Sequence, residues 1–515
     1  MKQFSNLNRD DIKKTYSFQC KIEEIRQTSG PTIFTLYDGT KTIKSTGFIK
    51  PGERAFPELE RGQNVSIKGQ VFERDGFFEI EIKEATPLNS DLEKEFIENL
   101  EKLANQQAEP FDIPFIVDSK VLNDLRPMML NVAKEIRKAI FSNRKIILKH
   151  HADCDGYSAG IALERAILPL IQEQHGVDSA EWFYYKRGPS KAPFYEYADV
   201  VKDLSFSIDD MNRFGQKAPL IILADNGSTE QDLLAIKKLK IYGAKVVVID
   251  HHYPGEVVNY RVAVDEFLDA HVNPYLMGHD STMCAGILGT EIARMINNNV
   301  HQIKHIPALA ATADRSKGEA IDKYKEIAFK IGLDQEYLSK LAECIDFESY
   351  YVKFMESRGL VNDLFGADVD KQRQMVELLY KDIEKRYEKS LLAAKHYMKV
   401  EDGGKYLLVS LVADKVTSRG EYPAIGKLIG MTHDFVSNQN PSRGVISMGL
   451  GPDFITLRMS DSVNFSVSEL INELTKKIPH GSIEGGGHKH AGSIKFLEGA
   501  HDEVHKLLFE KLRGF

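Results

Sequence analysis

The chain has 515 residues, of which 42% are hydrophobic and 28% charged, and its formal net charge is −8 at pH 7. At roughly 150 residues per domain, this length predicts three or four domains, and the composition excludes a disordered or fibrous protein. The acidic balance also excludes a protein that is basic over its whole surface and coats nucleic acid. It does not exclude nucleic acid as a substrate, because bound cations set the field at a site.

The four cysteines are far apart and form neither a CxxC pair nor a disulfide framework, so we expect a reducing compartment. They are Cys20, Cys154, Cys284 and Cys344. The polar N-terminus MKQFSNLNRD lacks the pattern of a signal peptide, and no run approaches the roughly 18 apolar residues of a membrane helix. The sequence therefore predicts a soluble, cytoplasmic protein.

Residues 16–88 contain five short segments in which apolar and polar residues alternate, which is typical of strands. Asp38-Gly39 and Arg74-Asp75-Gly76 predict hairpin turns between them. Five strands in about 70 residues favour a small β-barrel of the OB-fold type over residues 1–90. Another small β-module is the alternative.

Residues 91–122 are predicted to form a helical linker, interrupted by Pro110 and Pro114. In 123–318, apolar strands alternate with helices, which predicts an α/β domain with a parallel sheet. Residues 319–402 are rich in Lys and Glu and predict a helical insert followed by a long connecting helix. Strand patterns return in 403–515, where we expect a second α/β domain.

Three clusters of acidic residues and histidines each follow a buried strand of the first α/β domain. They are His151-Ala-Asp153-Cys-Asp155-Gly156, Asp225-Asn-Gly-Ser228 and Asp250-His251-His252. Ligands bind at the carboxyl ends of strands in open α/β sheets, where these clusters converge. Several buried carboxylates are costly without cations, and carboxylate with imidazole suits divalent metals. Together, the clusters predict a metal site.

Each cluster alone has a plainer interpretation. An Asp that follows a buried strand is commonly a helix cap, and Asp225 ahead of Asn-Gly-Ser could merely shape a turn. His251 and His252 could be one buried and one exposed histidine. Cys154, inside the first cluster, is expected to pack inertly, with a thiolate ligand as the alternative. The occurrence of all three clusters in chain order favours the metal site.

These three motifs resemble those of the DHH phosphoesterase superfamily. Residues 485–492, Gly-Gly-Gly-His-Lys-His-Ala-Gly, resemble the glycine-rich motif of its DHH-associated domain, and Ile455–Ser460 resemble the Arg-Ser strand of that domain. The resemblance covers about residues 125–515. The His at position 151 is most similar to that of archaeal-type RecJ-like exonucleases, since bacterial RecJ tends to carry Asp there.

The resemblance implies hydrolysis of a phosphodiester by two divalent ions, Mn²⁺ or Mg²⁺, about 3.5–4 Å apart. It implies that His151 and Asp153 hold one ion, that Asp155 and His251 hold the other, and that Asp225 bridges them. His252 is then expected to donate to the scissile phosphate. Asp250 is expected to orient the histidines.

The family also needs a fourth acidic ligand, for which we propose Asp314, beside a phosphate-facing Arg315. Asp265 and Asp269 are the competitors, and a salt bridge at a helix C-terminus is the plainer interpretation of Asp314. In the C-terminal domain, glycines without Cβ atoms allow backbone N–H groups to approach a phosphate. The substrate-binding residues expected there are Arg458, Ser460, Gly485, Gly486, Gly487, His488 and His490. An ordinary surface arginine remains the alternative for Arg458.

The barrel is expected to bind nucleic acid if one or two of its aromatic residues are exposed for base stacking, with lysines and Arg74 nearby for phosphates. The candidates are Phe34, Tyr37, Phe48, Phe72, Phe77 and Phe78, with Lys41, Lys44 and Lys68. A packing or interaction role is the alternative, because acidic and basic residues are about equally common there.

The predicted function is that of a metal-dependent, RecJ-like exonuclease that degrades single-stranded DNA or RNA to mononucleotides in repair or replication. One alternative is a phosphodiesterase or phosphatase for short oligonucleotides, cyclic dinucleotides or adenosine bisphosphate. Another is a replication scaffold, although the intact motifs favour an active site. Replication or repair proteins are candidate partners. Polarity, preference for DNA or RNA, the choice between Mn²⁺ and Mg²⁺, and oligomeric state stay open.

Overall fold

The computed structural model describes residues 2–74, 76–176, 180–190, 192, 194–214, 216–352, 359–366, 369–418, 420–463, 465–488 and 490–513. The chain divides into two compact units. The first comprises Met1–Ala342 and Tyr351–Ala367, and the second Glu343–Tyr350 and Asp368–Phe515. Among the helices of the described ranges, none is both long and apolar enough to cross a membrane.

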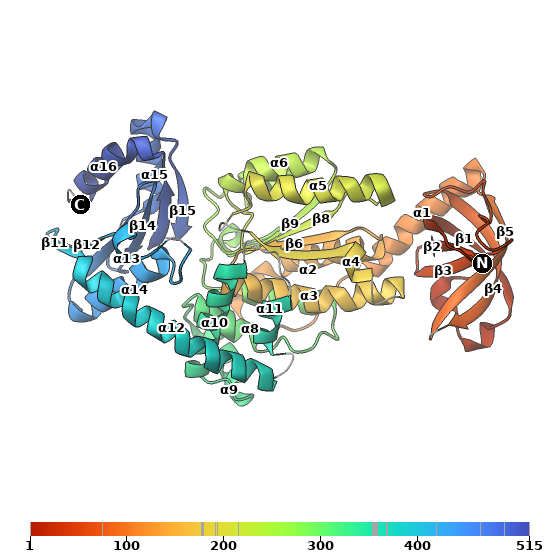
Figure 1. Cartoon of the computed structure of the whole chain (residues 1–515), viewed down its shortest axis with the longest axis horizontal. Helices are drawn as coiled ribbons and strands as arrows, with labels where there is room; N and C mark the ends of the chain where they lie inside the picture. The colour runs from red at the N-terminus through yellow and green to blue at the C-terminus, as the bar shows by residue number, and fades with distance from the viewer. Residues whose placement is uncertain are drawn as a thin grey trace. The chain divides into compact units, whose positions relative to one another are not determined.

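The first unit begins with a closed five-stranded barrel, in the order β1-β2-β3-β5-β4 (Figure 1). Its strands are β1 (Thr15–Gln27), β2 (Thr32–Tyr37), β3 (Thr42–Gly47), β4 (Asn64–Arg74) and β5 (Phe77–Pro87). Alternate side chains such as Phe18, Phe34 and Val71 fill its interior and are fully buried. The parallel pairing of β3 with β5 closes the barrel. The OB-type prediction is confirmed.

The same unit continues as a five-stranded parallel sheet, in the order β10-β9-β8-β6-β7. The strands are β6 (Ile146–His150), β7 (Tyr185–Pro189), β8 (Leu220–Ala224), β9 (Lys245–Ile249) and β10 (Ala270–Val272). The three central strands are those that the sequence predicts. The two edge strands, β7 and β10, were not predicted. β10 has only three residues, and the Tyr-Lys-Arg-Gly-Pro sequence of β7 is neither apolar nor alternating.

Helices cover both faces of this sheet (Figure 1). On one face are α2 (Lys120–Phe141) and α3 (Cys154–His175), and on the other are α5 (Tyr197–Phe214) and α6 (Leu233–Ile241). Behind α3 pack α7 (Ala285–Ile296) and α8 (Ile306–Ala313). The remaining helices that begin in this unit are α1 (Ser90–Gln107), α4 (Ala180–Tyr184), α9 (Glu319–Lys330), α10 (Gln335–Val352) and α11 (Gly359–Asn362).

The second unit contains a six-stranded mixed sheet, in the order β11-β12-β13-β14-β16-β15. Its strands are β11 (Lys399–Asp402), β12 (Tyr406–Val412), β13 (Gly444–Leu450), β14 (Phe454–Met459), β15 (Glu484–His488) and β16 (Ala491–Lys495). Its helices are α12 (Val369–Tyr397), α13 (Ala413–Val416), α14 (Ile425–Gln439), α15 (Val467–Lys477) and α16 (His501–Arg513). A separate apolar core, which includes Ile446, Leu457 and Ile494, shows that this unit has an interior of its own.

Close packing of α3 against α7 depends on a glycine. A Cβ atom on Gly289 would lie 2.9 Å from the Cα and 3.0 Å from the Cβ of Ala159. Real Cβ atoms rarely approach backbone so closely, and backbone cannot swing aside as a flexible side chain can. The separation of these two helices is therefore set by the absence of a side chain at Gly289.

We predict that Gly289→Ala destabilises the protein by about 1–3 kcal/mol, because overpacking outweighs the gain in helix propensity. The matched control is Gly430→Ala, since Gly430 also lies within a helix but has open space around it. That control should be neutral or stabilising by up to about 1 kcal/mol. Calorimetric unfolding of the full chain measures both, and equal effects would contradict the packing argument.

Candidate metal centre

The polar clusters meet because their strands are in register. His150 pairs with Ala224, and Ala224 pairs with Ile249. The ladder then continues for one residue past each strand, where the N–H of His151 donates to Ala224 O and that of Asp225 to Ile249 O. The next side chains of the three strands consequently emerge at one edge of the sheet.

Asp225 occupies the middle of this edge and is 1% exposed. Neither of its carboxylate oxygens has a hydrogen-bond partner among the described residues. Its φ of 59° is left-handed, which is uncommon for a residue with a side chain and typical of functional sites. Gly227 completes the turn at φ 102°, where a Cβ would lie 2.9 Å from Leu223. The turn interpretation is thus correct, and the turn also presents a buried carboxylate without a hydrogen-bond partner among the described residues.

Two sets of potential ligand atoms share this carboxylate. The sets are His151, Asp153 and Asp225, and Asp225, His251 and His252, and within each set the ligand atoms lie within 4.8 Å of one another. Nδ1 of His151 is 3.4 Å from Asp225 Oδ2, and Nε2 of His251 is 3.3 Å from Asp225 Oδ1. A buried carboxylate that lacks a hydrogen bond within the described part of the chain, and has imidazoles on both sides, fits two divalent cations.

Asp153 and Asp155 begin helix α3 and have different partners. Asp153 is the N-cap, since its Oδ1 accepts from the N–H of Gly156, while its Oδ2 lies 2.8 Å from Nδ1 of His151. The helix-cap interpretation is therefore correct for one of its oxygens. Asp155 accepts from the N–H groups of Ala285 and Gly286, both at 2.8 Å, at the N-terminus of α7. That helix terminus stabilises a second buried carboxylate.

The histidines are oriented by acceptors on their outer nitrogens. Nδ1 of His251 donates to the carbonyl of Ser281 at 2.9 Å, while Nε2 lies 3.6 Å from Asp155. Nδ1 of His252 donates to Asp250 at 2.8 Å. Such outer contacts usually set the tautomer of metal-binding imidazoles. Both histidines are largely buried, so the pattern of one buried and one exposed does not apply.

The structure brings Asp314 to this cluster and leaves its competitors elsewhere. Asp314 caps the end of α8, and its Oδ2 is 3.9 Å from Nδ1 of His251. Asp265 binds His271, and Asp269 binds Lys240 and Lys245. Arg315 is exposed beside it and has a φ of 56°.

The carboxylates and imidazoles of this cluster shift one another's pKa values. Burial, reinforced by the charge of Asp225, raises the pKa of Asp155 to about 8. Burial likewise raises the pKa of Asp314 to about 6. Burial opposes charge on His151 and His251, but neighbouring carboxylates outweigh it and raise the pKa of each well above its usual value. Without cations, the cluster therefore retains protons at neutral pH.

A buried chain of hydrogen bonds that the sequence analysis missed supports the Asp225 turn. Nδ1 of His271 donates to Asp265 at 2.8 Å, and its Nε2 lies 2.9 Å from Oγ of Ser228. Asn273 donates to the same Oγ and to the carbonyl of His252. Ser228 stands in the predicted motif, but His271 is 43 residues away, and only the parallel pairing of β10 with β9 brings it close.

The residues predicted in the C-terminal domain gather on one sheet of the second unit. Arg458, which is half-buried, pairs with Ala491, and the N–H of Met459 donates to the carbonyl of His490. Oγ of Ser460 accepts from the N–H of Val445. Gly485, Gly486 and Gly487 lie in β15 (Glu484–His488), as does the backbone of His488, whose side chain lies outside the described part of the structure. Nδ1 of His490 is buried and has no hydrogen-bond partner among the described residues.

The aromatic candidates on the barrel differ in their exposure to solvent. Phe34 is buried in its core, Tyr37 is buried and donates to the carbonyl of Phe141 on α2, Phe72 and Phe78 are half-buried, and Phe48 and Phe77 are exposed at 57% and 47%. One or two exposed rings are enough for a stacking surface, and the barrel has two. Cys154 is fully buried, like the other three cysteines.

We predict that His271→Ala weakens divalent-cation affinity about 10–100-fold, because the Asp225 turn loses its outer support. The control is His175→Ala, which also removes a buried histidine but at the far end of α3, where its ring stacks on Tyr184. Both variants should lower the melting temperature, whereas only the first should change Mn²⁺ affinity measured by calorimetric titration. Equal Mn²⁺ affinities of the two variants would show that His271 stabilises the fold but does not support the metal site.

Comparisons with known proteins place these domains in families. Residues 145–313 match the N-terminal domain of the DHH family, and residues 16–88 match an OB-fold nucleic-acid-binding domain. An uncharacterised protein of Methanocaldococcus jannaschii, MJ1198, is 45% identical over 509 residues, which are 94% of this chain and 67% of that protein.

Two solved structures extend the comparison. The DHH domain of PF0399, described as a member of the s1p family of ribosomal proteins, is 40% identical with a TM-score of 0.79, covering 82% of this chain and 99% of that one. RecJ of Thermus thermophilus in complex with Mn²⁺ is 14% identical with a TM-score of 0.53, covering 81% and 59%, and shares the fold. The chain therefore belongs to the DHH phosphoesterase superfamily, with an OB-fold barrel ahead of its DHH domain.

Proposed function

We propose that this protein is a metal-dependent phosphodiesterase that degrades single-stranded DNA or RNA from an end and releases mononucleotides. The observation that carries the proposal is the buried carboxylate of Asp225, which lacks hydrogen-bond partners among the described residues and belongs to two sets of potential ligand atoms. Superfamily membership and the OB-fold barrel support a phosphodiester of nucleic acid as the substrate.

In this proposal, His151 and Asp153 would hold one cation and Asp155 and His251 the second, and Asp225 would be shared by the two sites. Asp314 is the further acidic ligand. Two bound ions would supply an activated water and neutralise charge on the phosphate oxygens. The Mn²⁺ complex of the RecJ that shares this fold supports manganese, with magnesium as the alternative.

His252 is proposed to donate a proton in a hydrogen bond to the scissile phosphate. Although burial opposes its charge, the adjacent Asp250 raises the pKa of His252. The imidazole can then keep its Nδ1 hydrogen bond to Asp250 and still carry a proton on Nε2. Asp250 also accepts from the N–H groups of both His251 and His252, so it holds the segment in place.

Arg315 is proposed to bind the nucleic acid, and residues of the second unit are also proposed to bind it. Arg458 supplies a guanidinium, while Ser460 and His490 lie beside the strand pair that contains the glycines. Gly485, Gly486, Gly487 and His488 complete the proposed surface. The proposed setting is DNA repair or replication in the cytoplasm, which is consistent with four free, buried cysteines.

Asp225→Asn preserves the shape of the side chain and removes its charge, so we predict a loss of turnover of at least about a thousandfold. The control is Asp232→Asn, because Asp232 is also buried and lies seven residues further on, where it caps a local turn through Thr229. Activity is measured on 5′- and 3′-labelled single-stranded DNA and RNA, and on di- and trinucleotides, with Mn²⁺ or Mg²⁺. Activity confined to the short substrates would favour the small-substrate phosphodiesterase.

We predict that Mn²⁺ binding at pH 7 releases protons. Asp155, with its pKa of about 8, must ionise, and His151 and His251, whose pKa values are raised, must become neutral. Raising the pH removes the competing protons, so the affinity for Mn²⁺ rises from pH 6 to 8. Titration calorimetry in buffers of low and high ionisation enthalpy counts the protons. A pH-independent affinity without proton release would exclude this ligand set.

A further inference from the structure

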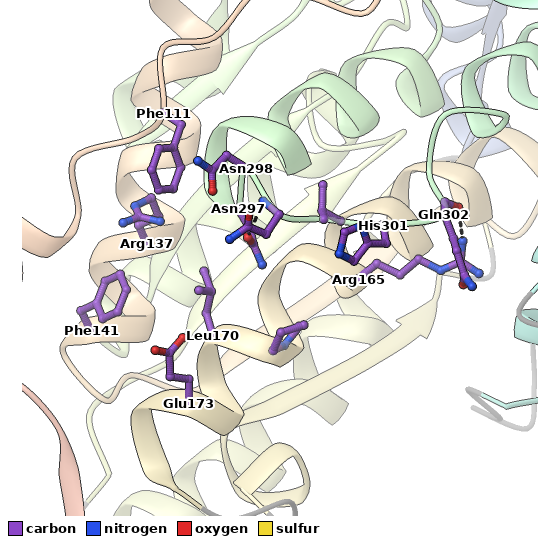
Figure 2. A pocket seen from close by; sticks show the side chains of 13 residues that line it. Phe111, Arg137, Phe141, Arg165, Leu170, Glu173, Asn297, Asn298, His301 and Gln302 are labelled. Carbon is purple, nitrogen blue, oxygen red and sulfur yellow. Dashed lines mark hydrogen bonds between the residues drawn. The ribbon is translucent and has the colours of Figure 1, made fainter. Parts of the chain in front are cut away.

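A cavity of about 580 Å³ lies at the ends of α3 and α7 opposite to the metal cluster (Figure 2). Its walls are the C-terminal halves of α2 and α3, the segment before α2, and the turn 297–302 after α7. Asp155 begins α3 and Leu170 lines the cavity, so the two sites are roughly 20 Å apart along this helix. The cavity is therefore distinct from the candidate metal centre.

Two arginines line the cavity, and neither forms an ion pair with a carboxylate in the described part of the chain. Arg137 is 8% exposed and donates to the carbonyls of Gln107 and Ile296 at 2.7 and 2.5 Å. Arg165 donates to the carbonyls of Gln302 and Phe365. Guanidinium groups stay charged in proteins, and Glu173 is the one carboxylate among the described residues that line this cavity, so the cavity holds an excess of one positive charge. Such a site favours a phosphate.

Aromatic and amide groups surround these charges. Figure 2 shows Arg137 between Phe111 and Phe141, whose ring centroids are 4.8 and 5.1 Å from its guanidinium carbon. Across the cavity, the buried Asn297 shapes the turn by accepting from the N–H of Asn299 at 3.0 Å. The turn thereby presents polar side chains at the rim. Rings, amides and unpaired cations are the groups that bind bases and phosphates of single strands.

The cavity continues onto the barrel. A neighbouring cavity of about 560 Å³ shares Phe141, Leu170 and Glu173 with the first, and barrel residues form its other side. We call the two together the barrel–α3 groove. Among its described lining residues, five are cationic and two are carboxylates; the cations are Lys41, Lys44, Arg74, Arg137 and Arg165, and the carboxylates are Glu79 and Glu173.

The exposed Phe77 also lines this groove, whereas Phe48, the other exposed barrel aromatic, does not. Glu79 is paired with Lys44 at 2.8 Å and lies 3.9 Å from Arg74, so five cations and two carboxylates leave an excess of three positive charges in the groove. A mononucleotide fills one cavity of this size. Two joined cavities with cations along both suit several consecutive nucleotides.

We propose that the barrel–α3 groove binds a stretch of single-stranded nucleic acid several nucleotides away from the end that is cleaved. The inference rests on the proposed function and adds the path of the strand: from Phe77 and Lys41 on the barrel, past Phe141, to Arg165 and the 297–302 turn. Strands long enough to occupy both the groove and the metal centre then bind more tightly than short ones.

The test uses the Asp225→Asn protein as the parent, so that substrate is not consumed. Anisotropy of fluorescent 20-residue thymidine and uridine strands measures affinity. Phe77→Ala and Arg165→Gln should each weaken binding by at least about fivefold, the lower end of what a lost stack costs. The matched controls are Phe329→Ala, whose side chain is 41% exposed against 47% for Phe77, and Lys330→Gln, with an exposed cation; both lie on α9. They should bind as the parent does.

Cross-linking provides a readout that does not depend on variant stability. Because all four native cysteines are buried, a new exposed one can be labelled selectively with a photoreactive maleimide. In the parent, Asn299→Cys should cross-link the strand and Lys330→Cys should not; both positions are exposed.

The outcomes separate the two proposals. If the parent binds neither strand, the proposed function fails and the groove fails with it. If the parent binds both strands, but groove variants and controls bind equally and the two cysteines cross-link equally, the groove inference alone is wrong. Weaker binding in the groove variants together with selective cross-linking at position 299 supports it.

Discussion

The buried negative charge at the end of three parallel strands is the constraint on which the rest of this structure depends. In-register pairing of β6, β8 and β9 directs Asp225 and its neighbours toward the same edge. Carboxylates so close together repel one another and lose hydration, so the fold must supply compensation. It does so with imidazoles, with the N-terminus of α7 at Asp155, and with backbone N–H groups at Asp250. Asp225 has imidazoles beside it but no hydrogen-bond partner for either oxygen among the described residues, and this is where bound cations are proposed.

Helices α3 and α7 connect this constraint to the remainder of the first unit. Their N-termini carry or support the acidic residues, and their C-termini frame the groove on the opposite side. Gly289 lets them approach closely enough for Asp155 on one helix to meet the backbone of the other. The same pair of helices therefore supports the candidate metal centre and the proposed path of the nucleic acid. The overall acidity of the chain does not oppose this path, because the groove has a local excess of cations.

Much of the fold and of the candidate site could be predicted because the signals are local. Buried central strands are short apolar runs, barrel strands alternate, and the acidic motifs follow strand ends directly. The edge strands β7 and β10 lack such a pattern. Likewise, nothing near His271 in the sequence links it to Ser228, because that contact is made between separate strands. The predicted division of ligands between two ions stays a prediction, since spacing along a chain does not determine distances around a metal.

The sequence by itself determined the domain types, the three polar motifs and their meeting at one sheet edge, because strand periodicity and parallel pairing leave little freedom once the apolar runs are known. Only the tertiary structure placed Asp314, and not Asp265 or Asp269, beside His251, left Phe48 and Phe77 exposed on the barrel, and gave Arg137 and Arg165 backbone carbonyls as their hydrogen-bond partners among the described residues. Each of these depends on which surfaces of distant segments pack together. Burial and charge compensation are properties of that packing, and no local pattern in the sequence encodes them.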